Sequence, residues 1–215
     1  MNSEMTGEEP FTDGVAELYS NSGTTPTVTK QVMSIGTTLK TGKWHPRGSG
    51  FLWKKEDQVV TAFHVIDGLL EVDAPVEAKT RSNIKLRCKV SNYSPRESDN
   101  GRDWAILELP NKEPPDPNPL LSVDNEIEAG ETVLFYGYPG DLANSNGITQ
   151  EIHRGFIDNI ADGGFTLTRP IPKGLSGGPV MKAETGNLVG YLVGNSQPPK
   201  SWVKGYGYTV RAIES

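Results

Sequence analysis

The chain has 215 residues, which is enough for one sizeable hydrophobic core or two small ones. Its 21 Lys and Arg residues against 27 Asp and Glu residues give a formal net charge of −6, which argues against general nucleic-acid binding. The single cysteine, Cys88, excludes an intrachain disulfide. This cysteine and the three histidines show no metal-ligand spacing, so neither a metal nor another cofactor is expected.

Residues 1–28 are rich in Ser, Thr, Gly, Asn and acidic residues, and this composition predicts a polar N-terminal tail or arm. They lack the basic start and the apolar run of a secretory signal. No stretch of the sequence is long and apolar enough to span a membrane. We therefore expect a cytoplasmic location and no membrane partner.

The rest of the chain predicts short strands joined by tight turns, because it is rich in glycine and proline and has no amphipathic helix of three turns. The first set of strands, in residues 29–112, comprises Gln31–Leu39, Gly48–Trp53, Val59–Ala62, Ile84–Tyr93 and Trp104–Leu109. The second set, in residues 127–215, comprises Thr132–Tyr136, Ile148–Asp158, Phe165–Thr168, Gly178–Lys182, Leu188–Val193 and Gly205–Val210.

A proline-rich stretch, residues 110–119, separates the two sets of strands. Prolines interrupt strand pairing and stiffen loops, so residues 113–126 are predicted to be a linker between two β-subdomains. A single all-β sandwich is the structural alternative.

Ser176 lies in the glycine-rich segment GLSGGPV, residues 174–180. Glycines allow such a loop to bend sharply and to turn its amide N–H groups inward. Inward amides beside a hydroxyl supply a nucleophile and hydrogen-bond donors for an oxygen that becomes negative, which acyl transfer requires. An ordinary glycine-rich turn is the alternative interpretation of this segment alone.

Two upstream residues have the chemistry to assist such a serine. His64 ends the apolar run that begins at Val59 and is followed by a turn signal, which places it at the end of a strand. Asp103 directly precedes an apolar run, so it is expected to be partly desolvated and to need a donor such as an imidazole N–H. Each residue alone has a structural explanation, but the order His, Asp, Ser is that of the chymotrypsin triad.

With these segments the chain resembles the chymotrypsin-fold serine peptidases, and among them it is most similar to HtrA-like (Deg-type) domains. The resemblance runs from roughly residue 30 to 212 and implies an all-β fold of two packed antiparallel β-barrels. The barrels would be residues 29–112 and 127–215, with the active site in the cleft between them. The segments that carry the resemblance are Gly48–Leu52, Thr61–Val65, Asp103–Leu107, Gly174–Pro179, Gly186–Tyr191 and Gly205–Val210.

The resemblance also implies a role for each residue of the site. Ser176 would be the nucleophile, His64 the general base and then acid, and Asp103 the group that orients the imidazole. The backbone N–H groups of Gly174 and Ser176 would form the oxyanion hole. The implied activity is that of a serine endopeptidase, which hydrolyses a protein or peptide substrate through an acyl-enzyme on Ser176.

Two residues depart from the pattern of the digestive trypsins. Leu175 replaces an aspartate that pairs with a freed N-terminus, so activation by N-terminal clipping is not expected. Ordering of loops, with a possible protein partner for activation or recruitment, is the expected alternative. Val193 replaces a hydroxyl residue that often supports the catalytic aspartate, so Asp103 is expected to find donors among backbone amides near His64.

The resemblance places the substrate pocket at residues 170–173, at Val193–Asn195 and at Tyr206. No carboxylate occupies the expected floor of the pocket, and its walls are largely apolar, so cleavage after small or aliphatic residues is expected. A strand edge at Val193–Asn195 would pair with the substrate backbone. The predicted substrate-binding residues are Pro170, Ile171, Lys173, Val193, Gly194, Asn195 and Tyr206.

Two other functions remain open from the sequence. One is a polyprotein-processing peptidase of a virus or mobile element. Many of those carry a histidine on the strand after the nucleophile, and Gly190–Asn195 has none. The other is a latent or non-catalytic binding module with the trypsin fold that a partner activates, an alternative that Leu175 and Val193 leave open.

Overall fold

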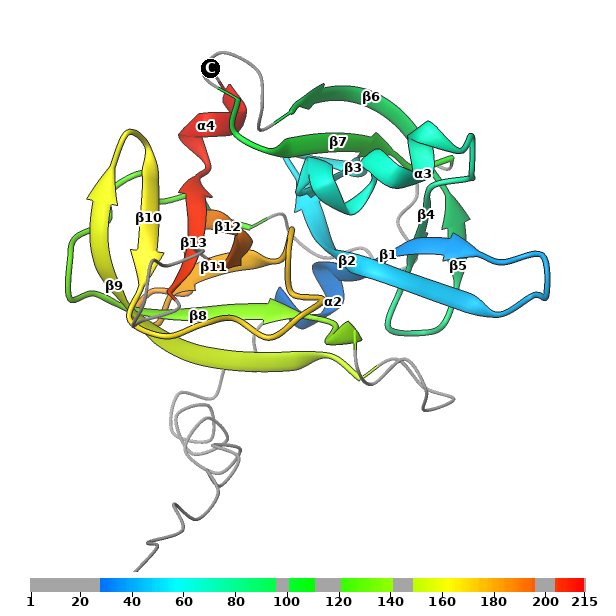
Figure 1. The fold of residues 1–215 in the computed structure, drawn as a ribbon. Helices are drawn as coiled ribbons and strands as arrows, with labels where there is room; N and C mark the ends of the chain where they lie inside the picture. Colours follow the sequence, from blue (N-terminus) through cyan, green and yellow to red (C-terminus); the bar gives the residue numbers. More distant parts are fainter. Residues whose placement is uncertain (1–27, 96–100, 111–120, 141–148, 196–203, 215) are drawn as a thin grey trace, which may run out of the picture.

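The computed structural model describes residues 28–95, 101–110, 121–140, 149–195 and 204–214, which form two β units (Figure 1). The first unit is a seven-stranded antiparallel sheet with the strand order β5-β4-β1-β2-β3-β7-β6. Its strands are β1 (Val32–Thr38), β2 (Trp44–Trp53), β3 (Lys55–Thr61), β4 (Glu77–Lys79), β5 (Lys85–Arg87), β6 (Lys89–Ser94) and β7 (Trp104–Glu108).

The second unit is a closed antiparallel barrel with the order β10-β13-β12-β11-β8-β9. Its strands are β8 (Thr132–Gly137), β9 (Glu151–Ala161), β10 (Gly164–Leu167), β11 (Pro179–Lys182), β12 (Leu188–Asn195) and β13 (Gly205–Thr209). The predicted all-β fold of two packed units is therefore confirmed, with one closed barrel and one half-barrel. Residues 1–27 of the predicted tail and residues 113–120 of the predicted linker lie outside the described residues.

Helices are short in the part of the chain that the structure describes. They are α2 (Val28–Gln31), the 3-10 turn η1 (Phe63–Val65), α3 (Asp67–Glu71) and α4 (Arg211–Glu214). None of these helices has the length and apolar character needed to cross a membrane.

The predicted strands form close to their expected positions, but β4 lies outside all of them and one predicted strand is divided. The segment Ile84–Tyr93 was expected to be one strand, but it divides into β5 and β6 at Cys88. The amide of Cys88 donates a hydrogen bond to the carbonyl of Val76, 2.8 Å away, and the chain then leaves β4 to pair with β7. The break follows from this change of partner strand, which local sequence does not encode.

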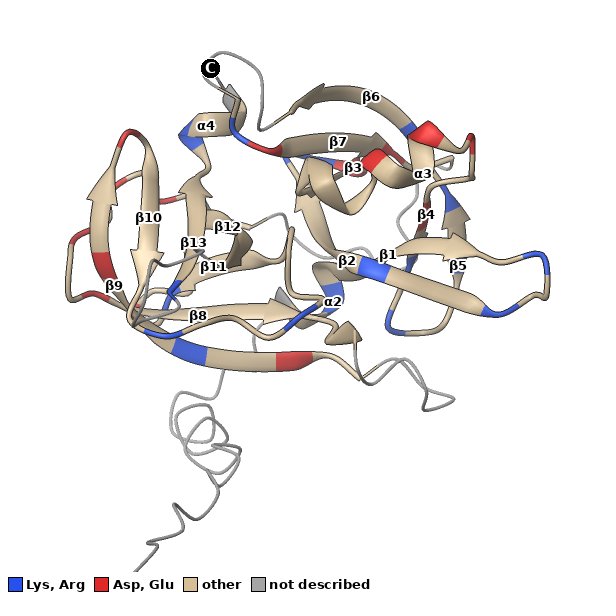
Figure 2. Cartoon of the chain, in the orientation of Figure 1, with Lys and Arg blue, Asp and Glu red and all other residues tan. Residues whose placement is uncertain are grey.

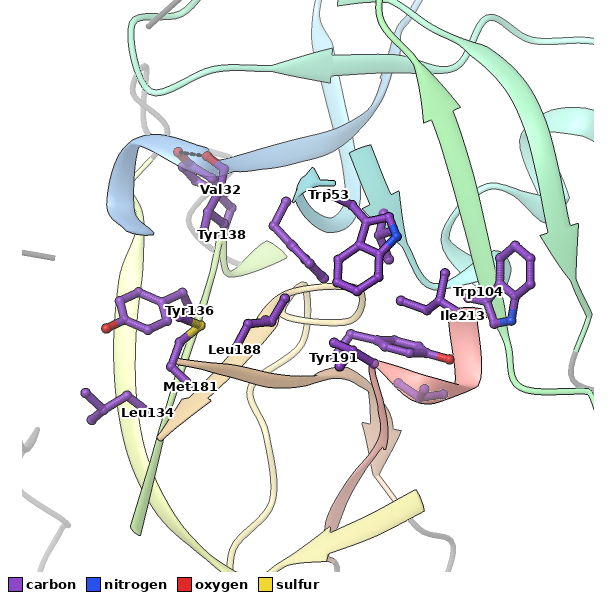
Figure 3. Packing of buried hydrophobic residues seen from close by; sticks show 14 residues of the cluster. Val32, Trp53, Trp104, Leu134, Tyr136, Tyr138, Met181, Leu188, Tyr191 and Ile213 are labelled. Atoms are coloured by element: carbon purple, nitrogen blue, oxygen red, sulfur yellow. Dashed lines mark hydrogen bonds between the residues drawn. The ribbon is translucent and has the colours of Figure 1, made fainter. Parts of the chain in front are cut away.

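A shared hydrophobic cluster joins the two units (Figure 3). The first unit contributes Trp53 and Trp104, and the barrel contributes Tyr138, Met181 and Tyr191, all of which are buried. Each unit also has a separate interior cluster of its own. Because aromatic side chains bury large apolar areas, this shared cluster fixes the two units against one another.

Acidic and basic residues are spread over the strands and the connecting turns of both units, as the ribbon colours in Figure 2 show. Lys40 and Lys43 are exposed at the tip of the β1–β2 hairpin. Among the acidic and basic side chains that the structure describes, Asp103 alone is buried, with 1% of its surface exposed. A buried carboxylate is costly unless hydrogen-bond donors compensate it, so Asp103 requires donors in its surroundings.

Candidate active site

Asp103 directly precedes β7 and adopts a left-handed backbone conformation with φ of 50°. Its Oδ2 atom lies 2.8 Å from His64 Nδ1, and its Oδ1 atom accepts a hydrogen bond of 2.9 Å from the backbone amide of His64. Its own carbonyl accepts the amide of Phe63 at 3.1 Å. The expectation that amides near His64 would support Asp103 is thus confirmed, and the buried carboxylate has a donor on each oxygen.

His64 lies in η1, the turn that directly follows β3, and 42% of its side-chain surface is exposed. Because Asp103 is a hydrogen-bond acceptor, Nδ1 carries the proton and Nε2 of the neutral imidazole keeps a free lone pair. Beside it, the ring of Phe63 stacks on Tyr93 with centroids 4.8 Å apart and planes 17° apart. The imidazole is therefore oriented from one side and open to a proton donor on the other.

Ser176 lies in the loop between β10 and β11 of the barrel, and this loop packs against the first unit. The amide of Ser49 in β2 donates a 2.8 Å hydrogen bond to the carbonyl of Ser176. A methyl group at Gly177 would lie 2.8 Å from the amide nitrogen of Ala62, two residues before His64. These contacts bring the serine loop to the histidine turn. The Ser176 hydroxyl itself has no hydrogen-bond partner among the described residues.

The peptide that joins Lys173 to Gly174 is oriented by its carbonyl. That carbonyl accepts a hydrogen bond of 2.9 Å from the amide of Gly140. In a planar trans peptide the C=O and N–H groups point in opposite directions, so the Gly174 N–H points away from Gly140. Gly174 has φ of 92°, and a side chain there would lie only 2.3 Å from the Gly140 nitrogen, so this position requires glycine.

The peptide that joins Leu175 to Ser176 is held in a similar way. The carbonyl of Leu175 accepts a hydrogen bond of 2.9 Å from the amide of Gly178. The Ser176 N–H therefore points away from Gly178. Neither this amide nor that of Gly174 donates to an acceptor in the described part of the chain. Both amides are therefore available to a ligand near the serine hydroxyl, as the predicted oxyanion hole requires.

Leu175 explains how the loop is anchored without the aspartate of digestive trypsins. Its side chain is fully buried in the interior cluster of the barrel. A methyl group on Gly137 would lie 2.9 Å from its Cγ atom, so the leucine fills its site closely. Hydrophobic burial of a leucine contributes about 1.5–3 kcal/mol and here takes the place of an ion pair.

The structure brings four of the predicted pocket residues together in two pairs. The side chain of Asn195 accepts the amide of Ile171 at 2.8 Å and donates to its carbonyl at 2.9 Å. Gly194 pairs with Tyr206 across β12 and β13, and a methyl on Gly194 would lie 3.7 Å from that ring. Val193 is buried in the shared cluster. The side chains of the remaining two predicted residues are exposed; these are Pro170 and Lys173.

Two residues with contacts in this region were not predicted. Ser49 is buried beneath the serine loop, and its only sequence signal is its place between two glycines in the Gly48–Leu52 segment. The hydroxyl of Tyr191 donates a 2.5 Å hydrogen bond to the carbonyl of Arg102, next to Asp103, and no local sequence pattern indicates it. Within the described ranges, no cluster of three or more His, Cys, Asp or Glu residues has a geometry that would hold a metal ion.

Two packed antiparallel β units, with an Asp–His pair from one beside a serine loop from the other, define the class of chymotrypsin-fold serine peptidases. The family model of the trypsin-like peptidase domain matches residues 48–190. The chain therefore belongs to the trypsin-like peptidase family.

Curated relatives place the chain near the HtrA-like (Deg-type) proteases. It is 29% identical over 151 residues to a probable periplasmic serine endoprotease DegP-like of Rickettsia prowazekii, and 28% identical over 151 residues to the protein of that name in Rickettsia conorii. Each match covers 67% of this chain and 28% of the relative. The chain thus spans less than a third of the length of these relatives.

Solved structures share the fold. Rv3671c from Mycobacterium tuberculosis H37Rv, in an inactive form, has a TM-score of 0.64 at 20% identity, with 96% of this chain and 92% of that chain covered. The MamO protease domain of Magnetospirillum magneticum has a TM-score of 0.65 at 20% identity, with 87% and 96% covered. The HtrA-type protease AlgW, with a bound tripeptide, has a TM-score of 0.63 at 21% identity, with 93% and 61% covered.

Proposed function

We propose that this protein is a serine endopeptidase that cleaves peptide bonds through a covalent acyl-enzyme on Ser176. The observation that carries this proposal is the pairing of the buried Asp103 carboxylate with both the ring and the backbone amide of His64. This double contact fixes the tautomer and the orientation that a general base needs.

We propose the following reaction for these groups. Ser176 Oγ attacks the substrate carbonyl, and its proton passes to His64 Nε2. The carbonyl oxygen becomes negative and accepts hydrogen bonds from the amides of Gly174 and Ser176. His64 then gives the proton to the leaving amine as the C–N bond breaks. Water, deprotonated by His64, attacks the acyl-enzyme and releases Ser176 and the second product.

Substrate binding is proposed at the end of β12. β11 pairs with β12 only as far as Tyr191, so Val193–Asn195 has one edge without a strand partner in the described structure. A peptide in extended conformation can add to such an edge through backbone hydrogen bonds. The buried Ile171 and the nearby Tyr206 ring favour small or aliphatic side chains before the cleaved bond.

Labelling with a fluorophosphonate, which reacts with activated serines, tests the proposal. We expect the purified chain to be labelled, and expect labelling to be lost in Ser176→Ala and in His64→Ala. Ser91→Ala, which changes an exposed serine in β6, is the matched control and should be labelled normally. Labelling that survives Ser176→Ala would rule out the proposed mechanism. A folded chain that is not labelled would contradict a peptidase that is active on its own and would favour the latent module.

A peptide library tests the substrate preference. We expect cleavage after Ala, Val, Leu or Ile, and no cleavage by the Ser176→Ala variant. A profile dominated by Lys or Arg at the position before the cleaved bond would show that the pocket has been assigned wrongly.

A further inference from the structure

Ser49 lies in β2 of the first unit, on the side of the sheet that meets the serine loop of the barrel. It is completely buried, and it pairs in register with Ser34 of β1. A buried polar side chain must find hydrogen-bond partners to offset its desolvation. Those of Ser49 come from the other unit, so they depend on how the two units pack.

Ser49 contacts the serine loop at two points. Its amide donates a hydrogen bond of 2.8 Å to the carbonyl of Ser176. Its hydroxyl donates a hydrogen bond of 2.8 Å to the carbonyl of Gly174. Gly174 and Ser176 are the two residues whose amides form the proposed oxyanion hole. One residue therefore holds the carbonyl of each of them.

The direction of the Ser49 hydroxyl is itself fixed. Its oxygen accepts a hydrogen bond of 2.9 Å from the amide of Tyr138, so its proton is directed toward Gly174. The carbonyl of Ser49 accepts a hydrogen bond of 2.7 Å from Thr61 Oγ1. The amide of Gly140 donates to the carbonyl of Lys173, and the amide of Gly178 donates to that of Leu175. Each carbonyl of residues 173–176 therefore has a donor. The loop is thus held on its carbonyl side along this whole stretch.

We propose that Ser49 is a positioning residue for the oxyanion hole, an inference that rests on the proposed peptidase function. It does not touch the substrate. By holding the carbonyl groups of Gly174 and Ser176, it keeps the amide groups of the same two residues facing the substrate carbonyl. Without the hydroxyl, the Gly174 carbonyl and the Tyr138 amide lose a buried partner, and the loop is free to shift.

The kinetic test compares Ser49→Ala with Ser34→Ala. Ser34 is equally buried on the paired strand, but its hydroxyl has no hydrogen-bond partner among the described residues, so this control removes the same atom away from the loop. At a temperature where both variants are folded, we expect Ser49→Ala to lower kcat about tenfold or more, because small displacements of catalytic groups are costly. KM should change less than about threefold, since the substrate-binding edge on β12 is untouched.

A purely structural role for Ser49 would lower the melting temperature and leave the kcat of the folded protein close to that of wild type. That result would overturn the proposal. Ser49→Cys has nearly the same shape with a weaker donor, and it is the variant to use if Ser49→Ala does not fold. It should also lower kcat, by a smaller factor than Ser49→Ala.

Amide hydrogen exchange tests Ser49 without reference to catalysis. We expect the amides of Gly177 and Gly178, which close the loop, to exchange faster in Ser49→Ala than in Ser34→Ala or wild type. Unchanged exchange would refute the proposal even in an active enzyme. A wild type that fails to react with a fluorophosphonate, together with the expected exchange, would refute the peptidase function and leave the loop contact established.

Discussion

At the scale of single residues, Asp103 combines two energetically unfavourable features. Its carboxylate is buried, and its backbone has φ of 50°, a conformation that few residues other than glycine, asparagine and aspartate adopt readily. His64 offsets the burial of the carboxylate by donating from its ring and from its backbone, and the amide of Phe63 holds the backbone carbonyl of Asp103. A residue held in this way orients its partner rather than merely neutralising it.

Asp103→Asn tests this orienting role. Asparagine tolerates the left-handed backbone, so the fold should persist. Its amide group no longer favours a proton on Nδ1 of His64, and we expect kcat on a peptide substrate to fall by about 10⁴-fold. Asp73→Asn, at an exposed aspartate with the same φ of 50°, is the control and should leave kcat unchanged. A loss smaller than about tenfold would contradict the assigned role.

We expect Asn195 to affect substrate specificity through its hydrogen bonds to Ile171. Its two hydrogen bonds tie the segment before Gly174 to the end of β12, on the side where the substrate is proposed to bind. Because the same side chain serves as donor and acceptor to one backbone, it restrains both the distance and the direction between the two segments. We expect this restraint to keep the proposed substrate pocket narrow.

Asn195→Ala should therefore widen the substrate preference. We expect kcat/KM for a peptide with Leu or Phe before the cleaved bond to rise about tenfold relative to one with Ala, a difference typical of changed apolar pocket contacts. Asn187→Ala, in the turn between β11 and β12, is the matched control. If the ratio of the two substrates is the same in wild type and Asn195→Ala, the restraint does not set the preference.

At the scale of elements, β9 carries a histidine, His153, that is not part of the candidate active site. His153 is largely buried in β9, stacks on Phe135 with centroids 5.5 Å apart, and places Nε2 at 2.8 Å from a carboxylate oxygen of Glu151. Burial lowers the pKa of His153 below its usual value, and this effect outweighs the opposing effect of Glu151. The barrel wall therefore favours a neutral imidazole.

The pH dependence of stability follows from this lowered pKa. In the unfolded chain the imidazole takes up a proton near its ordinary pKa of about 6.5, whereas the folded chain takes it up only at lower pH. The unfolded state therefore binds more protons in this interval, so the stability that His153 contributes is lost as the pH falls below about 6.5 toward the folded pKa.

His153→Gln should reduce the fall in the free energy of unfolding between pH 7 and pH 5, as measured by urea unfolding at each pH. His45→Gln, at an exposed histidine of β2, should leave this fall as it is in wild type. An unchanged pH dependence in His153→Gln would show that His153 does not contribute to the acid sensitivity.

At the scale of the whole molecule, two tyrosines connect the units through their hydroxyl groups. Tyr191 of the barrel bonds to the carbonyl of Arg102 at 2.5 Å, and Tyr138 bonds to the carbonyl of Val32 at 3.2 Å. Burial and the neighbouring Asp103 carboxylate raise the pKa of Tyr191, and burial raises that of Tyr138 to about 12. Both hydroxyl groups therefore remain protonated donors across the interface.

Replacing either tyrosine by phenylalanine should lower the free energy of unfolding by about 1 kcal/mol, the usual value of a hydrogen bond. Only Tyr191→Phe should also lower kcat, because its partner carbonyl lies next to Asp103. Tyr138→Phe is thus the control for a loss of stability without displacement of the triad. Equal kcat values for the two variants would show that the Tyr191 bond has no part in placing Asp103.

The sequence by itself determined the class of fold and indicated which residues form the candidate site. The strands follow from short apolar runs between turn residues, and those patterns are local. Ser176 was found because glycines on both sides report the bend of its loop. His64 and Asp103 were found because each adjoins an apolar run, and because their order along the chain matches a known arrangement.

Only the tertiary structure decided how these residues are held. Ser49, Asn195 and Tyr191 act through hydrogen bonds to backbone groups far away in the chain, and backbone groups are the same at every residue. No residue type at the accepting position signals such a bond. The closure of one unit into a barrel, and the break between β5 and β6, were likewise set by which strands pair, and pairing depends on contacts between segments distant in sequence.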